Sequence, residues 1–159
     1  MAKKIAVIGI GNTLRRDDGI GIVILESLLK LYQRKEIDYF NFGIASFDLI
    51  HRLRDYPTVL LIDGINASLP AGALKIFALK DIVHQPDNLA TSTHEINLKT
   101  IFELSGKFAP KTKIYVAGIQ VEDISYREGL SDGLKEKKDE IARQISIFIE
   151  QNLLGCSLR

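Results

Sequence analysis

Short apolar runs alternate with amphipathic stretches along this chain. Continuous apolar runs that end at glycine, acidic or turn residues are typical of strands buried on both faces of a sheet, whereas apolar positions three and four residues apart are typical of helices. This pattern predicts strands at residues 4–9, 37–42, 58–63, 73–79 and 113–119. It predicts helices at residues 18–33, 46–55 and 94–106, and a long last helix that opens at Ser131 or Asp132. An apolar stripe marks the buried face of this last helix: Leu134, Ile141, Ile145, Phe148 and Ile149.

The alternation of strands and helices indicates an α/β fold. We expect a single domain over residues 1–159, built as a three-layer sandwich in which a mostly parallel, twisted, five-stranded sheet carries helices on both faces. Right-handed crossovers make the first three strands parallel, so their carboxyl ends lie along one edge of the sheet. In such sheets ligands bind in the crevice outside that edge.

Composition narrows the choice of partners. With a net charge of +1 over 159 residues, we expect neither a nucleic-acid partner nor a membrane. Cys156 is the only cysteine, and glycine and asparagine within residues 9–12 interrupt any secretory signal, so we expect a cytoplasmic protein. Arg15 and Arg16 either lie in a solvated loop or steer an acidic partner toward the crevice.

The segment VIGIGNTLRRDDGIGI, residues 7–22, begins like a nucleotide-binding loop but departs from that pattern. Gly9 and Gly11 match two glycines of the dinucleotide fingerprint, and Leu14 stands where the third is needed. The chain has no Gly-Lys-Ser or Gly-Lys-Thr for a phosphate loop, and no Gly-x-Ser-x-Gly for a serine hydrolase. A nucleotide site and a serine nucleophile are therefore both disfavoured.

Three side chains remain as candidates for chemistry: Asp18 after the first strand, Asp63 at the end of the third, and His94 at the start of a helix. Two carboxylates and one imidazole form a mixed oxygen and nitrogen ligand set that suits Ni, Zn, Mn or Fe. Two carboxylates at one crevice repel each other unless a cation or a shared proton lies between them. We interpret the set as a metal site.

Each candidate also has an ordinary structural explanation. Either Asp17 or Asp18 could cap the following helix, while the other faces the crevice. Asp63 could accept hydrogen bonds from loop amides at the strand end. His94 could be a first-turn helix residue without a ligand role. The sequence alone leaves these alternatives open.

Four segments resemble, in order, those of the [NiFe]-hydrogenase maturation endopeptidases. The first is similar to the N-terminal signature of that family, Gly-x-Gly-Asn-x-Leu followed by two acidic residues and a glycine. The segments are GIGNTLRRDDGIG (9–21), LLIDGI (60–65), STHEINL (92–98), and VAGIQVE (116–122) with GLSDGL (129–134). The segments are spread from residue 9 to residue 134, so the resemblance extends over nearly the whole chain.

The resemblance implies an endopeptidase that removes a short C-terminal extension from the precursor of the hydrogenase large subunit after nickel insertion. It implies that Asp18, Asp63 and His94 are the catalytic and metal-contacting residues. The precursor would supply the Ni²⁺, so the resting enzyme is expected to be metal-free. Either the metal or a carboxylate, in the manner of an aspartic protease, would activate the water. Hydrogenase assembly chaperones are further candidate partners.

Some positions depart from the family pattern. The family usually has Asp-x-Gly-Thr after the second strand, where this chain has Asn41 and Ile44, and Val121 replaces a proline. The neutral amide of Asn41 cannot act as a general base. An alternative function is therefore a non-proteolytic protein that senses metal or binds the precursor. A small-molecule hydrolase or phosphorylase is a third class, which predicts a deep, closed pocket with anion-binding residues. The long loop at residues 80–93 is a candidate lid.

Overall fold

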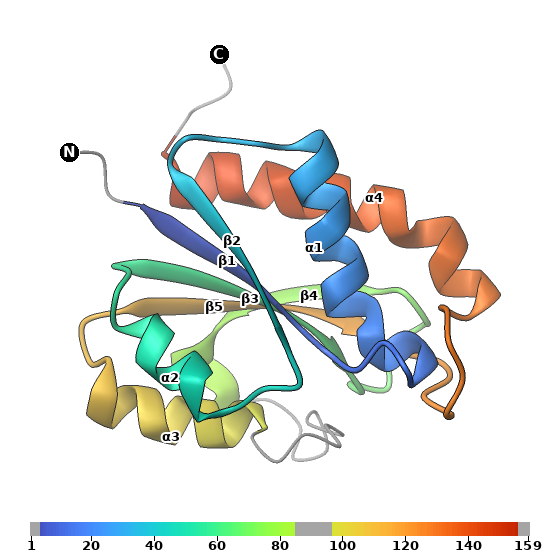
Figure 1. Cartoon of the computed structure of the whole chain (residues 1–159), viewed down its shortest axis with the longest axis horizontal. Coiled ribbons are helices and arrows are strands. Elements are labelled where there is room, and N and C mark those ends of the chain that lie inside the picture. The colour runs from blue at the N-terminus through green and yellow to red at the C-terminus, as the bar shows by residue number, and fades with distance from the viewer. Residues whose placement is uncertain (1–3, 85–96, 156–159) are drawn as a thin grey trace.

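The computed structural model describes residues 4–84 and 97–155, which form one twisted sheet between two layers of helices (Figure 1). The strands are β1 (Ile5–Ile10), β2 (Ile37–Gly43), β3 (Thr58–Ile65), β4 (Leu74–Ala78) and β5 (Lys113–Gln120). The helices are α1 (Ile20–Leu31), α2 (Phe47–Leu53), α3 (Leu98–Phe108) and α4 (Asp132–Phe148). Shorter helical turns are η1 (Arg16–Gly19), η2 (Leu79–His84) and η3 (Ile149–Leu153).

The strand order in the sheet is β2-β1-β3-β5-β4. Four strands are parallel, and β4 pairs antiparallel with β5 at one edge. The chain winds outward from β1 to β2 on one side and from β1 to β3 on the other, so the direction of winding reverses between β1 and β3. The predicted α/β fold is confirmed, and the reversal places the expected ligand crevice outside the carboxyl ends of these two strands.

Two apolar cores lie on the two faces of the sheet. Alternate residues of each strand point to opposite faces. Ile8 and Leu61 pack on the face covered by α2 and α3, whereas Val7 and Leu60 pack on the face covered by α1 and α4 (Figure 1). All four are fully buried, and burial of one such side chain contributes about 1.5–3 kcal/mol relative to an exposed one. The helices therefore cover both faces of the sheet through two separate apolar cores.

The last helix packs through the predicted apolar stripe. Leu134, Ile141, Ile145 and Ile149 are buried, and the ring of Phe148 contacts another aromatic ring on β5. The pattern of this helix therefore correctly predicted the face that covers the sheet. None of the helices in the described part of the chain combines the length and the apolar character that crossing a bilayer requires.

Several predicted boundaries are wrong by a few residues. The aspartates expected in the first turn of α1 lie in the 3-10 turn η1, and α1 itself begins at Ile20. Helix α3 begins at Leu98, where the side chain of Asn97 caps it by accepting a hydrogen bond from the amide of Thr100 at 2.9 Å. It continues through Gly106, where the sequence predicted its end. The expected loop 80–93 starts within η2, and its remainder from residue 85 lies outside the described residues.

The signature glycines let α1 lie directly on the sheet. A Cβ atom at Gly21 would lie 2.2 Å from the carbonyl oxygen of Ile10 and 2.3 Å from that of Ile62. A Cβ atom at Gly9 would lie 2.7 Å from the carbonyl oxygen of Gly21. Close contact between helix and sheet therefore accounts for these glycines, and no phosphate is needed to explain them.

Candidate active site

Asp18 and Asp63 lie at the point where the winding of the sheet reverses. Asp63 lies on β3 and Asp18 on η1, just beyond β1, and their exposed fractions are only 3% and 4%. Burial, reinforced by the negative charge of Asp18, raises the pKa of Asp63 well above its ordinary value, although the backbone amide of Gly64 opposes the shift. The structure therefore brings together two of the three predicted site residues, as interacting carboxyl groups in a low-dielectric environment.

The loop after β1 folds back to hold Asp18. The backbone amide of Asn12 donates a hydrogen bond to Oδ2 of Asp18 at 3.3 Å. A Cβ atom at Gly11, where φ is +155°, would lie 2.2 Å from the carbonyl oxygen of Asp18, so only glycine permits this approach. The amide of Gly11 also donates to the carbonyl of Gly43 at the end of β2, at 2.8 Å. These contacts fix the position of the second acid of the signature.

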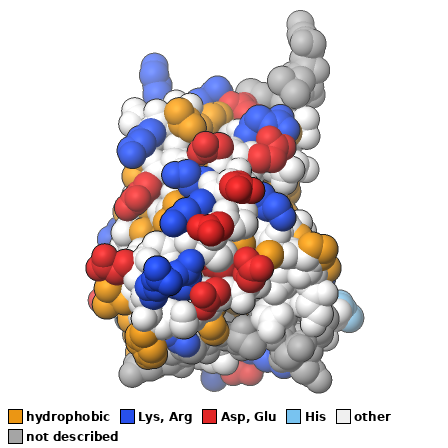
Figure 2. Space-filling view, turned by 90° about the vertical axis from the view of Figure 1, so that its right-hand side faces the viewer, with side chains coloured by type: hydrophobic (Ala, Val, Ile, Leu, Met, Phe, Trp, Pro, Cys, Tyr) orange, Lys and Arg blue, Asp and Glu red, His pale blue; other side chains and the backbone are white. Residues whose placement is uncertain are grey.

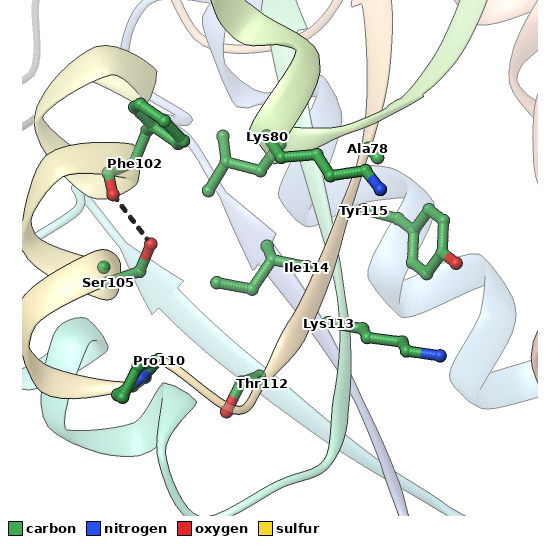
Figure 3. A pocket seen from close by; sticks show the side chains of 12 residues that line it. Ala78, Lys80, Phe102, Ser105, Pro110, Thr112, Lys113, Ile114 and Tyr115 are labelled. Carbon is green, nitrogen blue, oxygen red and sulfur yellow. Dashed lines mark hydrogen bonds between the residues drawn. The ribbon is translucent and has the colours of Figure 1, made fainter.

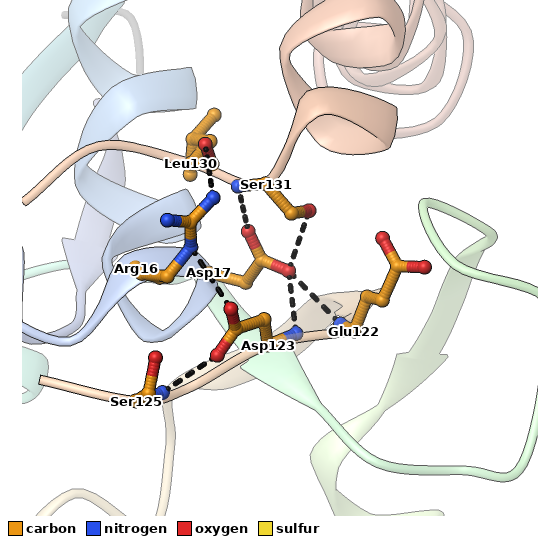
Figure 4. A network of polar contacts seen from close by, with 7 residues as sticks. All are labelled: Arg16, Asp17, Glu122, Asp123, Ser125, Leu130 and Ser131. Atoms are coloured by element: carbon orange, nitrogen blue, oxygen red, sulfur yellow. Dashed lines mark hydrogen bonds and ion pairs between the residues drawn. The ribbon is translucent and has the colours of Figure 1, made fainter. Parts of the chain in front are cut away.

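The first acid, Asp17, has a different role. Its fully buried carboxylate accepts hydrogen bonds from the amides of Glu122 and Asp123, at 3.0 and 2.9 Å, and from the amide and hydroxyl of Ser131, at 2.7 and 2.8 Å (Figure 4). Asp17 therefore does not cap α1, and the alternative that it is the N-cap of this helix is wrong. It fastens the connection after β5 and the first residues of α4 to the loop that carries Asp18.

The two arginines of the signature are engaged within the protein. Nε of Arg16 lies 3.1 Å from a carboxylate oxygen of Asp123, and its Nη2 donates to the carbonyl of Leu130 at 3.3 Å (Figure 4). The guanidinium carbon of Arg15 lies 4.9 Å from the centre of the Tyr126 ring, which is cation–π geometry. Neither arginine fits the description of a solvated loop, and both tie the loop after β1 to the connection after β5.

Gln120 is a structural residue of this edge and is not among the residues predicted for the site. The side chain is buried at the end of β5, and its Oε1 accepts from the amides of Ala67 and Leu69 at 2.7 and 3.2 Å. Its Nε2 donates to Asn66 Oδ1 and to the carbonyl of Val121, at 3.2 and 2.9 Å. A polar residue at the end of an apolar strand is the signal that could have identified Gln120, since the same signal identified Asp63.

Asn41, the departure from the family pattern, is exposed at the carboxyl end of β2. Its Oδ1 accepts a hydrogen bond from the amide of Gly43 at 2.8 Å. The register between β1 and β2 shifts at this point, where Gly9 pairs with Asn41 and Ile10 pairs with Gly43. Asn41 therefore holds a turn at the same edge of the sheet as Asp63, and its side chain supplies no titratable group there.

The third predicted ligand, His94, lies outside the described residues, as does Cys156. Within residues 4–84 and 97–155, no three His, Cys, Asp or Glu side chains are grouped closely enough to hold a metal ion. His51 and His84 are exposed on the surface. The described part of the site is thus an oxygen pair, and a nitrogen ligand from His94 remains a prediction.

The pocket in Figure 3 lies at the opposite edge of the sheet. Its volume is about 380 Å³, and its walls come from the end of β4, the start of β5 and α3. Lys80, Lys113 and Phe102 are among its lining residues, whereas Asp18 and Asp63 are not. The acid pair therefore does not open into this pocket, and a small-molecule enzyme that uses the acids would need a different cavity.

Comparison with known proteins identifies the family. The family model for hydrogenase maturation proteases, HycI, matches residues 22–147. The chain belongs to the hydrogenase maturation protease family. A candidate hydrogenase maturation protease of Methanocaldococcus jannaschii is 28% identical over an alignment that covers 94% of this chain and 90% of the relative. The resemblance that the sequence showed is confirmed.

Solved structures of the family share the fold. The [NiFe] hydrogenase maturation protease HycI from Thermococcus kodakarensis superposes with a TM-score of 0.75 at 22% identity, covering 93% of each chain. The hydrogenase maturating endopeptidase HybD from E. coli also gives a TM-score of 0.75, at 20% identity and 94% coverage of each chain. At these identities the solved structures show the shared fold alone.

Proposed function

We propose that this protein is the endopeptidase that removes the C-terminal extension of a [NiFe]-hydrogenase large-subunit precursor after nickel insertion. Family membership supports a peptidase that acts on a hydrogenase precursor. The observation that carries the proposal further is the meeting of Asp18 and Asp63, both buried, at the carboxyl edge where the sheet reverses its winding. Peptide hydrolysis needs one group that accepts a proton and one that donates a proton, and this pair can supply both.

The two acids have complementary roles in hydrolysis. Asp18, whose carboxylate accepts a hydrogen bond from a backbone amide, takes a proton from water as the water oxygen bonds to the scissile carbonyl carbon. Asp63, whose raised pKa favours the protonated form, gives its proton to the leaving nitrogen as the C–N bond breaks. One water is consumed: its oxygen and one hydrogen end in the new carboxyl group, and its second hydrogen is on Asp18. Transfer of this proton from Asp18 to Asp63 replaces the proton given to the amine and restores the starting state of the pair.

Nickel in the precursor makes this reaction selective. The carboxylate of Asp18, the carbonyl oxygen of the Asp63 carboxyl group and the imidazole of His94 form a mixed oxygen and nitrogen donor set that suits a divalent transition metal. A bound divalent ion can also lower the pKa of water to roughly 7. A loaded precursor brings a cation that this donor set can bind, whereas an empty precursor brings none, so the two precursors differ in affinity. Cleavage therefore follows nickel insertion.

The test replaces Asp18, Asp63 and His94 singly by alanine and measures cleavage of nickel-loaded and nickel-free precursor by mass spectrometry. We expect each variant to cleave the loaded precursor at least about 100-fold more slowly than the unmodified protein. Asp139→Ala and His84→Ala are matched controls, because both residues are exposed and lie in α4 and η2, away from the acid pair. Unchanged cleavage by all three site variants would reject the assignment.

A second candidate function is precursor binding without proteolysis. It is favoured by Asn41, which places a neutral amide where the family usually has an acid. Under this candidate, the unmodified protein binds the nickel-loaded precursor and leaves its C-terminal extension intact after prolonged incubation. Asn41→Asp would then restore cleavage if the position needs an acid, since a carboxylate can still accept the hydrogen bond from Gly43.

A further inference from the structure

The carboxyl end of β2 and the connections that follow the other three parallel strands share one arrangement. In each, a side-chain oxygen of Asn or Asp accepts a hydrogen bond from the backbone amide two residues later, which forms an Asx turn. The four bonds join Asn12 to Leu14 at 3.0 Å, Asn41 to Gly43 at 2.8 Å, Asn66 to Ser68 at 3.3 Å and Asp123 to Ser125 at 2.9 Å. The same local geometry thus recurs four times at one edge of the sheet.

A large, exposed hydrophobic side chain lies at the end of each Asx turn or directly after it. This side chain is either the donor residue of the turn or the residue after it, and a fifth such side chain begins α2. We call this set the apolar rim; its members and exposed fractions are Leu14 (58%), Ile44 (52%), Phe47 (66%), Leu69 (39%) and Tyr126 (83%). Exposed hydrophobic side chains that gather at one place on a soluble domain typically mark an interaction surface.

Direct contacts join the four turns into one continuous edge. The amide of Gly11 bonds to the carbonyl of Gly43, which joins the turns after β1 and β2. The amide of Arg16 bonds to the carbonyl of Arg127 at 2.9 Å, which joins the turns after β1 and β5. The side chain of Gln120, at the end of β5, accepts hydrogen bonds from two backbone amides of the turn after β3, which joins this turn to β5. The apolar rim therefore stands on loops that lie side by side around Asp18 and Asp63.

Charged groups near the rim are largely engaged with each other. Arg16 pairs with Asp123, and Arg15 stacks on Tyr126. Figure 2 shows the right-hand side of the view in Figure 1, where acidic and basic side chains are interspersed and hydrophobic side chains lie between them. Because Asp123 neutralises Arg16 and the five side chains of the rim are hydrophobic, we expect the contact surface of the partner to be apolar as well. The centres of protein–protein interfaces have this character, with aromatic residues enriched and charged residues depleted.

We propose that the apolar rim docks the folded body of the hydrogenase large-subunit precursor, so that the C-terminal extension enters between the turns and reaches the acids; this rests on the proposed function. Asp18 and Asp63 are almost completely buried, so a substrate chain meets the rim before it meets them. The rim comes from four separate loops, which suits a broad folded surface better than a single extended peptide. Because hydrogen bonds already fix the turns, little conformational entropy is lost on docking.

The experiment compares rim variants with variants of exposed hydrophobic residues elsewhere. The rim variant combines Leu14→Ser, Phe47→Ser and Tyr126→Ser, and each change is also made singly. The control combines Leu31→Ser and Phe108→Ser, whose side chains are 76% and 52% exposed at the last residues of α1 and α3. Circular dichroism and thermal unfolding confirm that each variant folds. Binding of nickel-loaded precursor and its cleavage kinetics are then measured in parallel.

We expect the rim triple variant to bind the precursor at least about tenfold more weakly, with a raised KM and an unchanged kcat, while the control variant matches the unmodified protein. Binding and KM within twofold of the unmodified protein would overturn the docking surface and leave the proposed peptidase intact. If the unmodified protein binds the precursor without cleaving it and the rim variant loses that binding, the docking surface stands and the peptidase does not. If the unmodified protein does not bind the precursor, the docking surface is overturned.

Discussion

The carboxylate of Asp17 accepts a hydrogen bond from the amide of Ser131 at 2.7 Å, between residues 114 positions apart. This contact joins the loop after β1 to the start of α4, beside the residue proposed to act in catalysis. Two adjacent aspartates of one signature thus have separate roles. Asp17 holds the loops of the site in place. Asp18 interacts with Asp63, and the negative charge of Asp18 helps to raise the pKa of Asp63.

Replacement of Asp17 by asparagine should destabilise the fold. The carboxylate accepts four hydrogen bonds without exposure to solvent, and an amide keeps only one acceptor oxygen. We expect the free energy of unfolding, measured by urea denaturation, to fall by about 2–3 kcal/mol. Asp139→Asn, at an exposed position of α4, should change it by less than about 0.5 kcal/mol. An equal effect at the two positions would contradict the structural role of Asp17.

The same substitution at Asp63 should have the opposite sign. Asp63 is buried beside Asp18, and its carboxylate is disfavoured by burial and by the neighbouring charge. A neutral amide removes that cost, so Asp63→Asn should raise the free energy of unfolding by about 1 kcal/mol at pH 7, measured in the presence of a metal chelator. Cleavage of the precursor should be lost at the same time. A loss of stability comparable to that of Asp17→Asn would show that Asp63 is structural.

A single methyl group at Gly21 should disrupt the packing of α1 on the sheet. The added Cβ would lie 2.2 Å from the carbonyl oxygen of Ile10, and backbone atoms cannot move aside cheaply. We expect Gly21→Ala to cost at least about 3 kcal/mol of stability or to prevent folding. Gly106→Ala is the matched control, because Gly106 is also helical but no atom lies within 4 Å of its added Cβ. The control should stabilise the protein by about 0.5–1 kcal/mol, as alanine does in exposed helices.

The acid stability of the fold should depend on Asp38. The Tyr56 hydroxyl donates to Oδ2 of Asp38 at 2.7 Å, and this bond, with Lys4, lowers the pKa of Asp38 below its ordinary value. A lowered folded-state pKa stabilises the fold above the unfolded-state pKa, about 3.9, and that contribution is lost as the pH falls through the folded-state pKa. Tyr56→Phe should therefore be less stable than the unmodified protein at neutral pH, with a smaller difference below about pH 4.

Thermal unfolding between pH 2.5 and 7 measures this difference. Tyr126→Phe is the control, because the Tyr126 ring is 83% exposed at the protein surface. A stability difference for Tyr56→Phe that stays constant over the whole pH range would mean that the hydroxyl acts through packing and leaves the ionisation of Asp38 unchanged.

Local sequence patterns determined where the strands and the buried face of the last helix lie. Apolar runs placed all five strands, and the stripe from Leu134 to Ile149 identified the buried face of the last helix, because side-chain periodicity is a property of neighbouring residues. Parallel crossovers then implied that Asp18 and Asp63 would lie at one edge. Helix starts were less accurate, since capping by Asn97 and the 3-10 turn at Arg16–Gly19 depend on local hydrogen bonds that periodicity does not reveal.

Only the tertiary structure assigned separate roles to Asp17 and Asp18. Both are acidic, both precede α1, and either could have capped it, but the donors that Asp17 satisfies come from residues more than 100 positions away. The use of Gln120 as an anchor for the turn after β3 is decided in the same way, by amides that meet its side chain only in the folded chain. Residue type limits what a buried polar group can do, and the partners that folding brings within hydrogen-bond distance decide what it does.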